Sequence, residues 1–250
     1  MSLLRVENVS KHFGSLVAVD QVSMTVEPGE LRAVIGPNGA GKTTFFNLIS
    51  GFLTQTSGRI VFDGEDVSNM LPARRVWRGM ARTFQITEVF PELSVRENLR
   101  VPVEVAAGHR LSPWMSGDAN DEMRARVSEL LDMGGLSEKA DRLVGELSHG
   151  DQRATEIMMA LALKPRLLLL DEPTAGMGDQ ETYDITQLIR KLHRNEKLTI
   201  VLIEHDMRVV FHLADRIMVL AEGKMLAEGT PKEIAANEVV QAAYLGKAAA

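Results

Sequence analysis

The amino-acid sequence predicts an α/β fold with a mainly parallel sheet, for three reasons. After residue 146, short apolar runs of strand length alternate with helix-length stretches, which is typical of parallel β/α units. An apolar run at 31–35 leads through a glycine-rich turn into a helical segment at 42–50. Between these parts, residues 86–146 carry mostly helical patterns. The sequence therefore combines an α/β core with a helical insertion.

The individual elements follow from local patterns along the chain. Alternating apolar residues, with a turn signal at Gly14, predict two strands at 3–9 and 16–26. Gly51 provides a natural end for the helix at 42–50. Further strands are predicted at 59–62, 81–84, 167–170, 199–203, 216–220 and 224–227. Helices are predicted at 95–107, 122–133, 180–196 and 232–245, with another ending at 163 and a loop at 108–120.

Composition and charge restrict the possible functions. The chain has 250 residues, a formal net charge of −6 and no cysteine. The acidic balance argues against nucleic acid as a partner, because binding to its phosphates needs clustered Lys and Arg. Arg74, Arg75 and Arg78 do form a local cluster, and the simplest interpretation is a solvated helix face. Without cysteines, disulfides and cysteine-ligated metals are excluded, which fits the cytosol.

The apolar runs of this chain are too short to predict a segment that spans a membrane. No N-terminal stretch resembles a secretory signal, and no run approaches the ~20 apolar residues that span a bilayer. The densest apolar segments, 157–163 and 167–170, are too short. If the protein works at a membrane, we expect another chain to provide the span.

The strongest motif is a glycine-rich turn that fits G-x-x-x-x-G-K-[ST] between a predicted strand and a predicted helix. Its glycines let successive N–H groups point at phosphate oxygens, and the helix N-terminus adds partial positive charge. Lys42 is expected to reach the β- and γ-phosphates, and the Thr43 hydroxyl to ligate Mg²⁺. The alternative is a glycine-rich turn with an incidental lysine, which this context disfavours. The predicted phosphate-binding residues are Gly36, Pro37, Asn38, Gly39, Ala40, Gly41, Lys42, Thr43 and Thr44.

Polar side chains follow two other predicted strands. Asp171 and Glu172 come directly after the apolar run 167–170, and His205 follows the strand at 199–203. Because the carboxyl ends of parallel strands meet at one edge of a sheet, we expect all three near the glycine-rich turn. Asp171 suits the shell of Mg²⁺, Glu172 suits polarisation of an attacking water, and His205 suits contact with a γ-phosphate. Taken alone, these residues would be a charged turn and an isolated histidine.

A fourth motif lies at 147–152, before a predicted helix. Ser148 and Asp151 have the spacing of a capping box, which stabilises a helix start. The same helix N-terminus, with Gly150 allowing close approach, also suits an anion. One chain then has two phosphate-seeking helix N-termini, although a single ATP does not need both from one subunit. The sequence therefore indicates a second copy that contributes the other half-site.

The order of these motifs resembles the nucleotide-binding subunit of an ABC (ATP-binding cassette) transporter over nearly the whole chain. The resemblance implies one ABC ATPase domain at 1–250, a P-loop NTPase with a RecA-like core and a small antiparallel β subdomain. The core would comprise 1–85 and 161–250, the helical signature subdomain 86–160, and a C-terminal helical tail 231–250. It also implies ATP hydrolysis, with ATP and Mg²⁺ as cofactors.

The resemblance assigns roles to three further positions. Gln85 would contact Mg²⁺ and water and link to the membrane subunits. Ser148 and Gly150 would contact the γ-phosphate of the ATP held by the opposite subunit. Phe13 would stack on adenine; the alternative for Phe13 is a core or strand-end aromatic.

Several segments are similar to the branch of importers for branched-chain amino acids, whose relatives carry urea and short amides. The resemblance implies membrane permease subunits, a second ATP-binding subunit, identical or homologous, and indirectly a periplasmic or extracellular substrate-binding protein. The implied location is peripheral, on the cytoplasmic face of the inner or plasma membrane. The usual family pattern is broken at His149, Asp151 and Gly178, which affects contacts between subunits. The similar segments are 82–85, 90–95, 147–150, 174–177 and 228–231.

Three alternatives stay open at this point. An exporter motor is the nearest, although exporters more often fuse the cassette to its membrane domain. A soluble ABC ATPase acting on DNA or ribosomes would usually carry two cassettes or a long coiled-coil insertion. A binding-only regulatory module is disfavoured by the intact Glu172 and His205. The transported substrate, the permease and the identity of the second cassette do not follow from the sequence.

Overall fold

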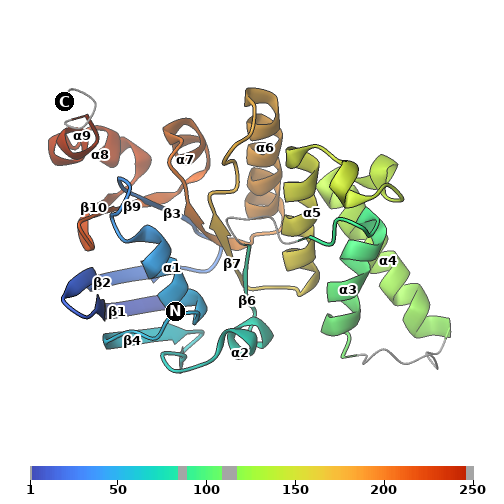
Figure 1. The fold of residues 1–250 in the computed structure, drawn as a ribbon, viewed down its shortest axis with the longest axis horizontal. Coiled ribbons are helices and arrows are strands. Elements are labelled where there is room, and N and C mark those ends of the chain that lie inside the picture. Colours follow the sequence, from blue (N-terminus) through green and yellow to red (C-terminus); the bar gives the residue numbers. More distant parts are fainter. Residues whose placement is uncertain (1, 84–88, 109–116, 246–250) are drawn as a thin grey trace.

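The computed structural model describes residues 2–83, 89–108 and 117–245, which form two sheets and a group of helices (Figure 1). The strands are β1 (Leu4–Phe13), β2 (Leu16–Val26), β3 (Leu31–Ile35), β4 (Ser57–Phe62), β5 (Glu65–Asp66), β6 (Met80–Arg82), β7 (Leu167–Asp171), β8 (Thr199–Ile203), β9 (Arg216–Ala221) and β10 (Lys224–Gly229). The α-helices are α1 (Lys42–Ser50), α2 (Pro72–Trp77), α3 (Val95–Ala106), α4 (Gly117–Gly134), α5 (His149–Ala162), α6 (Asp179–Asn195), α7 (Met207–Leu213), α8 (Pro231–Ala235) and α9 (Glu238–Leu245). Short 3₁₀ helices span Ser137–Lys139 and Val144–Glu146.

The main sheet confirms the predicted parallel α/β core. Its strand order is β10-β9-β3-β8-β7-β6, and only the β9–β10 pair is antiparallel. Every residue of β3, β7 and β8 is buried, as expected of strands covered on both faces. These three strands are neighbours and run in the same direction, so the loops that follow them meet at one edge. The fold thereby brings the three predicted strand-end motifs together.

A second, four-stranded antiparallel sheet has the order β2-β1-β4-β5. Helix α1 lies between this sheet and the main sheet (Figure 1). Phe45, Phe46, Leu48 and Ile49 of α1 are fully buried in one cluster with residues of both sheets. The glycine-rich turn before α1 is therefore anchored to a helix with apolar contacts on two sides.

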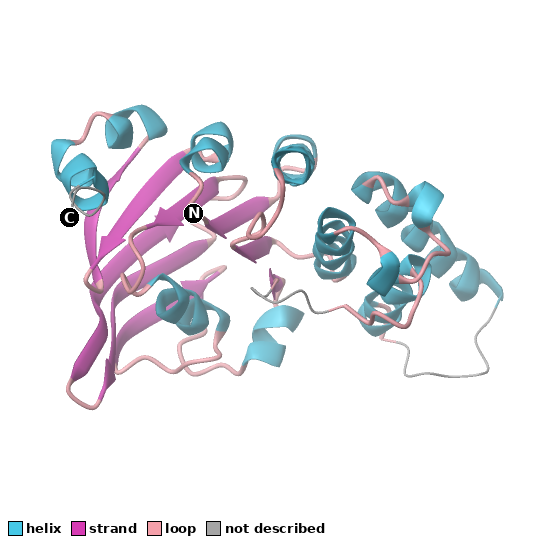
Figure 2. Cartoon of the chain, turned by 45° about the horizontal axis from the view of Figure 1, so that its top comes forward, coloured by secondary structure: helices cyan, strands magenta, loops and turns pink. Residues whose placement is uncertain are grey.

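The helices α3, α4 and α5 pack around a separate apolar cluster that continues onto α6 and the main sheet. Figure 2 shows α3 and α4 at the end of the molecule away from the antiparallel sheet. The prediction of a loop at 108–120 is wrong for residues 117–120, because they form the start of α4. Residues 109–116 lie outside the described residues.

The C-terminal segment also differs from the prediction of one helix over 232–245. It forms α8 and α9, which are separated at Ala236 and Asn237. The Asn237 side chain accepts hydrogen bonds from the N–H groups of Val239 and Val240, so this residue starts a new helix. The apolar periodicity of the sequence continues across the break and therefore predicted one helix. It does not report that the asparagine side chain competes with the helix backbone for N–H groups.

Arg75 contradicts the predicted solvated arginine cluster. Arg75 is buried, with 1% of its surface exposed, whereas Arg74 and Arg78 are exposed. Burial lowers the pKa of Arg75 to about 10, so the guanidinium stays charged at neutral pH. Gly51 leaves room for it, because a Cβ at that residue would lie 2.7 Å from Arg75 Nε. The guanidinium donates hydrogen bonds to the backbone carbonyls of Leu48, Ile49, Ser68 and Met70.

Arg75→Ala is expected to lower the free energy of unfolding by about 3 kcal/mol, because several buried carbonyls lose a charged donor. Two of them, Leu48 and Ile49, are near the C-terminus of α1, where a helix leaves its carbonyls without intrahelical partners. Urea unfolding gives the measurement, and Arg74→Ala, on the exposed side of α2, is the matched control with an expected change below about 0.5 kcal/mol. Equal effects of the two substitutions would contradict the assignment.

Candidate nucleotide-binding site

A cavity of about 590 Å³ lies beside the glycine-rich turn that joins β3 to α1. Seven of the nine predicted phosphate-binding residues line it, and so does Glu172. Gly36 and Pro37 stand at the start of the turn and do not line the cavity. The lining residues are Leu16, Val17, Ala18, Asn38, Gly39, Ala40, Gly41, Lys42, Thr43, Thr44, Glu172, Glu222 and Gly223.

Two glycines shape the turn because no side chain fits there. Gly41 has a φ of +96°, and a Cβ on it would lie 2.4 Å from the carbonyl oxygen of Ala18. A Cβ on Gly36 would lie 2.2 Å from the carbonyl oxygen of Leu220. The turn is thus pressed against β2 and β9, and its curvature requires glycine.

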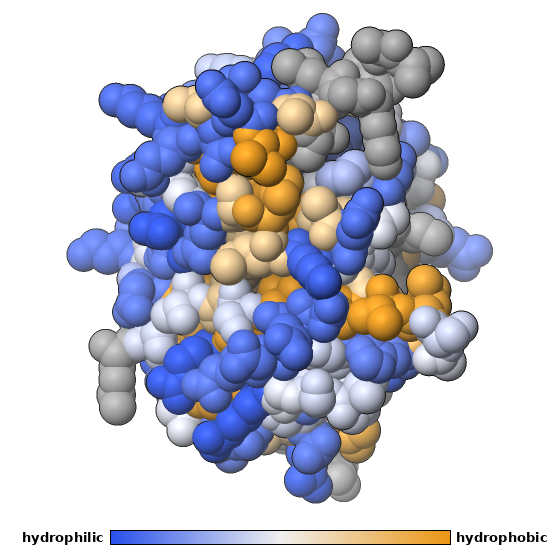
Figure 3. Space-filling model, turned by 90° about the vertical axis from the view of Figure 1, so that its left-hand side faces the viewer, coloured by the Kyte–Doolittle hydropathy of each residue, from blue (hydrophilic) through white to orange (hydrophobic). Residues whose placement is uncertain are grey.

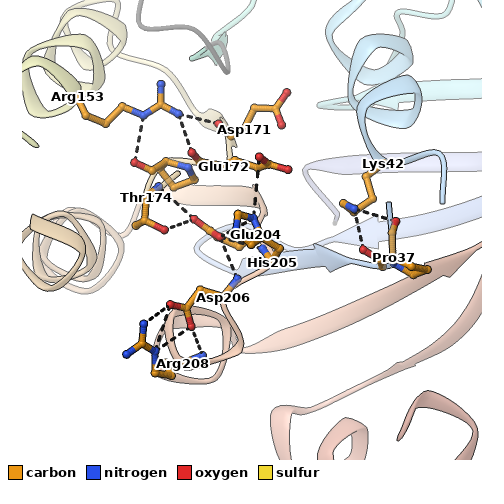
Figure 4. A network of polar contacts seen from close by, with 12 residues as sticks. Pro37, Lys42, Arg153, Asp171, Glu172, Thr174, Glu204, His205, Asp206 and Arg208 are labelled. Atoms are coloured by element: carbon orange, nitrogen blue, oxygen red, sulfur yellow. Dashed lines mark hydrogen bonds and ion pairs between the residues drawn. The ribbon is translucent and has the colours of Figure 1, made fainter. Parts of the chain in front are cut away.

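Lys42, the first residue of α1, folds back over the turn. Its Nζ donates hydrogen bonds to the carbonyl oxygens of Gly36 and Pro37, at 2.7 and 3.1 Å (Figure 4). Burial lowers the pKa of Lys42, and the carboxylates of Glu172 and Asp171 oppose this shift. The predicted lysine and the two predicted carboxylates therefore act on one another electrostatically.

Asp171, the last residue of β7, is 2% exposed. Its Oδ2 accepts a hydrogen bond from Arg82 Nη2 at 2.9 Å. Burial raises the pKa of Asp171, an effect that Arg82 opposes. Arg82, at the end of β6, also donates to Asn47 Oδ1 and Ser50 Oγ of α1, both at 2.7 Å. This arginine joins three elements of the site, and sequence reasoning assigned it no role.

Within the described ranges no group of three or more His, Cys, Asp or Glu residues is placed to hold a metal ion. Mg²⁺ is commonly held by one or two carboxylates together with substrate phosphates. Thr43 is exposed at the cavity, and Asp171 offers a carboxylate at the neighbouring strand end. The residues therefore fit an ion that arrives with a nucleotide.

Glu172 and His205 meet across the ends of β7 and β8. Glu172 Oε2 lies 4.0 Å from His205 Nδ1, and the His205 side chain is 61% exposed. The N–H of Glu172 donates to the carbonyl of Ile203 at 3.0 Å. Glu172 has a φ of +45°, a left-handed conformation that is rare for residues other than glycine and concentrates at functional sites. The structure brings the two predicted residues together.

Arg153 connects the helical part to the same loop. It lies in the first turns of α5 and is 3% exposed. Its guanidinium donates to the carbonyls of Asp171, Glu172 and Pro173, at 2.7, 3.2 and 3.3 Å (Figure 4). Sequence reasoning missed this contact, and the available signal was the i,i+3 spacing of Arg153 and Glu156, which form a buried ion pair on one face of α5.

The motif at the start of α5 forms the N-cap half of the predicted capping box. The Ser148 Oγ accepts the N–H of Asp151 at 3.2 Å, and Lys139 Nζ contacts both Asp151 carboxylate oxygens at 2.7 Å. The N–H of Gly150 donates to Glu181 Oε1 at 3.1 Å, and this bond is the main cause of the lowered pKa of Glu181. Ser148 and Gly150 do not line the cavity of the glycine-rich turn. In the single chain, a carboxylate therefore occupies the predicted anion position.

Phe13 is the last residue of β1 and is 46% exposed, so the core alternative is wrong and the strand-end position is correct. Lys11 Nζ lies 5.1 Å from the centroid of its ring. Phe13 pairs with Leu16, which lines the cavity and is 64% exposed. Figure 3 shows the side of the molecule that lies at the left in Figure 1, where hydrophobic surface stands among mainly hydrophilic residues. Gln85 lies outside the described residues.

The fold and the loop between β3 and α1 define a P-loop nucleotide-binding protein. A family model described as ABC transporter matches residues 19–175, and the chain belongs to this family. A second model, described as branched-chain amino acid ATP-binding cassette transporter, matches residues 224–250. The predicted family and fold class are both confirmed.

Curated relatives include ATP-binding proteins of amino acid transport and of an export system. The chain is 40% identical to the high-affinity branched-chain amino acid transport ATP-binding protein BraF of Pseudomonas aeruginosa, over 98% of each chain. It is 36% identical to the lipopolysaccharide export system ATP-binding protein LptB of Haemophilus influenzae, over 99% of this chain and 98% of the relative.

Solved structures of ATP-binding cassettes share the fold. The ADP conformation of the cassette MJ1267 has a TM-score of 0.86 at 34% identity and covers 98% of this chain and 99% of its own. The dimeric cassette MJ0796, bound to ADP and Pi, has a TM-score of 0.76 at 29% identity and covers 91% of this chain and 98% of its own. In the ranges that the structure describes, no helix is both long enough and apolar enough to cross a bilayer.

Proposed function

We propose that this chain is the ATP-hydrolysing subunit of an importer for branched-chain amino acids or related small polar molecules. The observation that carries the proposal is the shared cavity of Lys42, Thr43 and Glu172, with His205 4.0 Å from Glu172. The match of residues 224–250 to a branched-chain amino acid cassette model supports the importer branch.

In the proposed reaction, the N–H groups of the P-loop bind the phosphates of ATP, and Lys42 exchanges its two carbonyl partners for phosphate oxygens. Thr43 and Asp171 would hold Mg²⁺, which supplies neutralising charge on the phosphates when bound. Glu172 polarises the attacking water, and His205 contacts the γ-phosphate. Gln85 stays a prediction as a further contact to Mg²⁺ and water.

The second half-site would come from another cassette, identical or homologous. Ser148 and Gly150 of one subunit would contact the γ-phosphate held by the P-loop of its partner. Glu181 then has to release the Gly150 N–H, because one donor cannot serve both anions. The dimeric state of the related MJ0796 cassette supports this arrangement.

Permease subunits would convert closure of the two cassettes into transport, with a periplasmic or extracellular substrate-binding protein delivering the cargo. The protein is then peripheral, on the cytoplasmic face of the membrane. The three-part division into a core at 1–85 and 161–250, a helical subdomain at 86–160 and a tail at 231–250 belongs to this proposal. An exporter motor is the second candidate, because the chain is 36% identical to a lipopolysaccharide export protein.

Transport by the assembled complex tests the direction and the cargo. The chain is co-purified with its permease subunits, placed in proteoliposomes with the cassettes outside, and given ATP and Mg²⁺. We expect labelled leucine, isoleucine or valine, supplied inside with the binding protein, to appear outside in an ATP-dependent manner that EDTA abolishes. Hydrolysis without movement of any of these amino acids would contradict branched-chain amino acids as the cargo while leaving the ATPase intact, and an absence of hydrolysis would contradict the whole proposal.

A further inference from the structure

Glu204 is a carboxylate that lies at the centre of the polar network beside the cavity (Figure 4). It is the first residue after β8 and is 0% exposed. An isolated buried carboxylate is costly, so a buried one is expected to have several hydrogen-bond donors. Glu204 has four such donors, two on each oxygen, and they come from two different loops.

One oxygen holds the loop that follows Glu172. Glu204 Oε1 accepts the backbone N–H of Thr174 at 3.1 Å and the Thr174 hydroxyl at 2.5 Å. Thr174 is itself buried, with 6% of its surface exposed. Because Thr174 is only two residues beyond Glu172, this contact restricts where the Glu172 backbone can lie.

The other oxygen holds the loop that carries His205. Glu204 Oε2 accepts the backbone N–H of His205 at 2.9 Å and that of Asp206 at 3.3 Å. The His205 side chain is largely exposed, and its Nδ1 lies 3.8 Å from the same Glu204 oxygen. Its backbone, and therefore the starting direction of its side chain, is set by the buried carboxylate.

We propose that Glu204 is a positioning residue for ATP hydrolysis, because it fixes Glu172 and His205 relative to each other. This inference rests on the proposed function of those two residues. A single rigid carboxylate joins the loops after β7 and β8, and the bond from the Glu172 N–H to the Ile203 carbonyl joins them at a second point. This double attachment holds the backbones of the two loops together, and Glu172 Oε2 lies 4.0 Å from His205 Nδ1.

The chemistry requires a carboxylate rather than any polar side chain. All three backbone groups are N–H donors, so both oxygens have to accept. A glutamine at this position has one accepting oxygen, and its NH₂ group would face N–H donors on one of the two sides. Glu204→Gln therefore keeps the size of the side chain and breaks the attachment of one loop. Glu204→Asp keeps both acceptors on a shorter side chain.

Steady-state kinetics on the full chain test the proposal. For Glu204→Gln we expect kcat to fall about 30- to 100-fold, because small misplacements of reacting groups have effects of this size. The KM for ATP and the Kd of a fluorescent ATP analogue should change less than about 3-fold, because the P-loop is untouched. Glu204→Asp should recover at least part of kcat. Rates are divided by the folded fraction from thermal unfolding, and Glu196→Gln, on an exposed position, controls for the lost charge.

Thr174→Val supplies a second, independent test. It removes one donor to Glu204 and keeps the shape of the side chain, so we expect a smaller loss of kcat, about 5-fold. The double variant with Glu204→Gln should lose less kcat than the two single losses multiplied together, because the two residues share the contact at Glu204 Oε1.

Three results would overturn the inference: normal kcat per folded molecule in Glu204→Gln, an increase in Kd as large as the fall in kcat, or strictly additive effects in the double variant. If the wild type hydrolyses ATP and Glu172→Gln does not, such a result removes only the role of Glu204. If the wild type is inactive, or Glu172→Gln is fully active, the proposed function itself fails and the inference fails with it.

Discussion

Glu172→Gln is expected to bind ATP as the wild type does and to lose at least about 99% of its turnover. The substitution preserves the size of the side chain that lines the cavity, so the space for the nucleotide is unchanged. The amide cannot accept a proton from the attacking water, and it removes a negative charge that lies 4.0 Å from His205 Nδ1. Phosphate release at saturating ATP measures turnover, and titration with a fluorescent ATP analogue measures binding.

Glu196→Gln is the charge-matched control for this experiment, because Glu196 is exposed at the end of α6. Full turnover by Glu172→Gln would remove Glu172 from its proposed role. A parallel loss of ATP binding would instead place Glu172 in the binding site and leave the residue that polarises water unidentified.

Lys42→Ala is expected to weaken ATP binding about 100-fold, because a charged donor directed at phosphate is lost from a partly buried position. The substitution also leaves the carbonyls of Gly36 and Pro37 without the lysine that holds them. The P-loop should then be less ordered before nucleotide arrives, which adds to the loss. Equilibrium titration with the fluorescent analogue gives the Kd directly.

Lys232→Ala removes an exposed lysine from α8 and serves as the control. If Lys42→Ala bound ATP normally and lost only turnover, the lysine would act in the transition state alone. Backbone N–H groups would then account for nucleotide binding.

The sequence predicted the elements of the core well where strands are buried on both faces. The predicted bounds of β3, α1 and β8 match the structure. Such strands appear as continuous apolar runs with clear ends, and the signal does not depend on the rest of the chain. Short helices at the surface were harder to predict. Helix α7 was missed because its seven residues are too few to show a repeating apolar pattern.

The sequence also predicted that Glu172 lies near the P-loop, with Asp171 and His205 beside it, because strand order brings the ends of β3, β7 and β8 to one edge. It did not predict their partners. Arg82 contacts Asp171 across 89 positions of sequence, and Glu204 contacts Thr174 across 30. Arg75 was predicted on the solvated face of a helix and is instead buried against the end of α1.

The sequence by itself determined the protein family, the P-loop and the strand-end motifs, since each is encoded by adjacent residues whose local geometry is nearly independent of context. The tertiary structure alone decided which buried charges meet. A buried guanidinium or carboxylate takes whichever donors and acceptors the packing of distant elements places within about 3 Å. That choice depends on how helices and sheets come together, and no short stretch of sequence contains it.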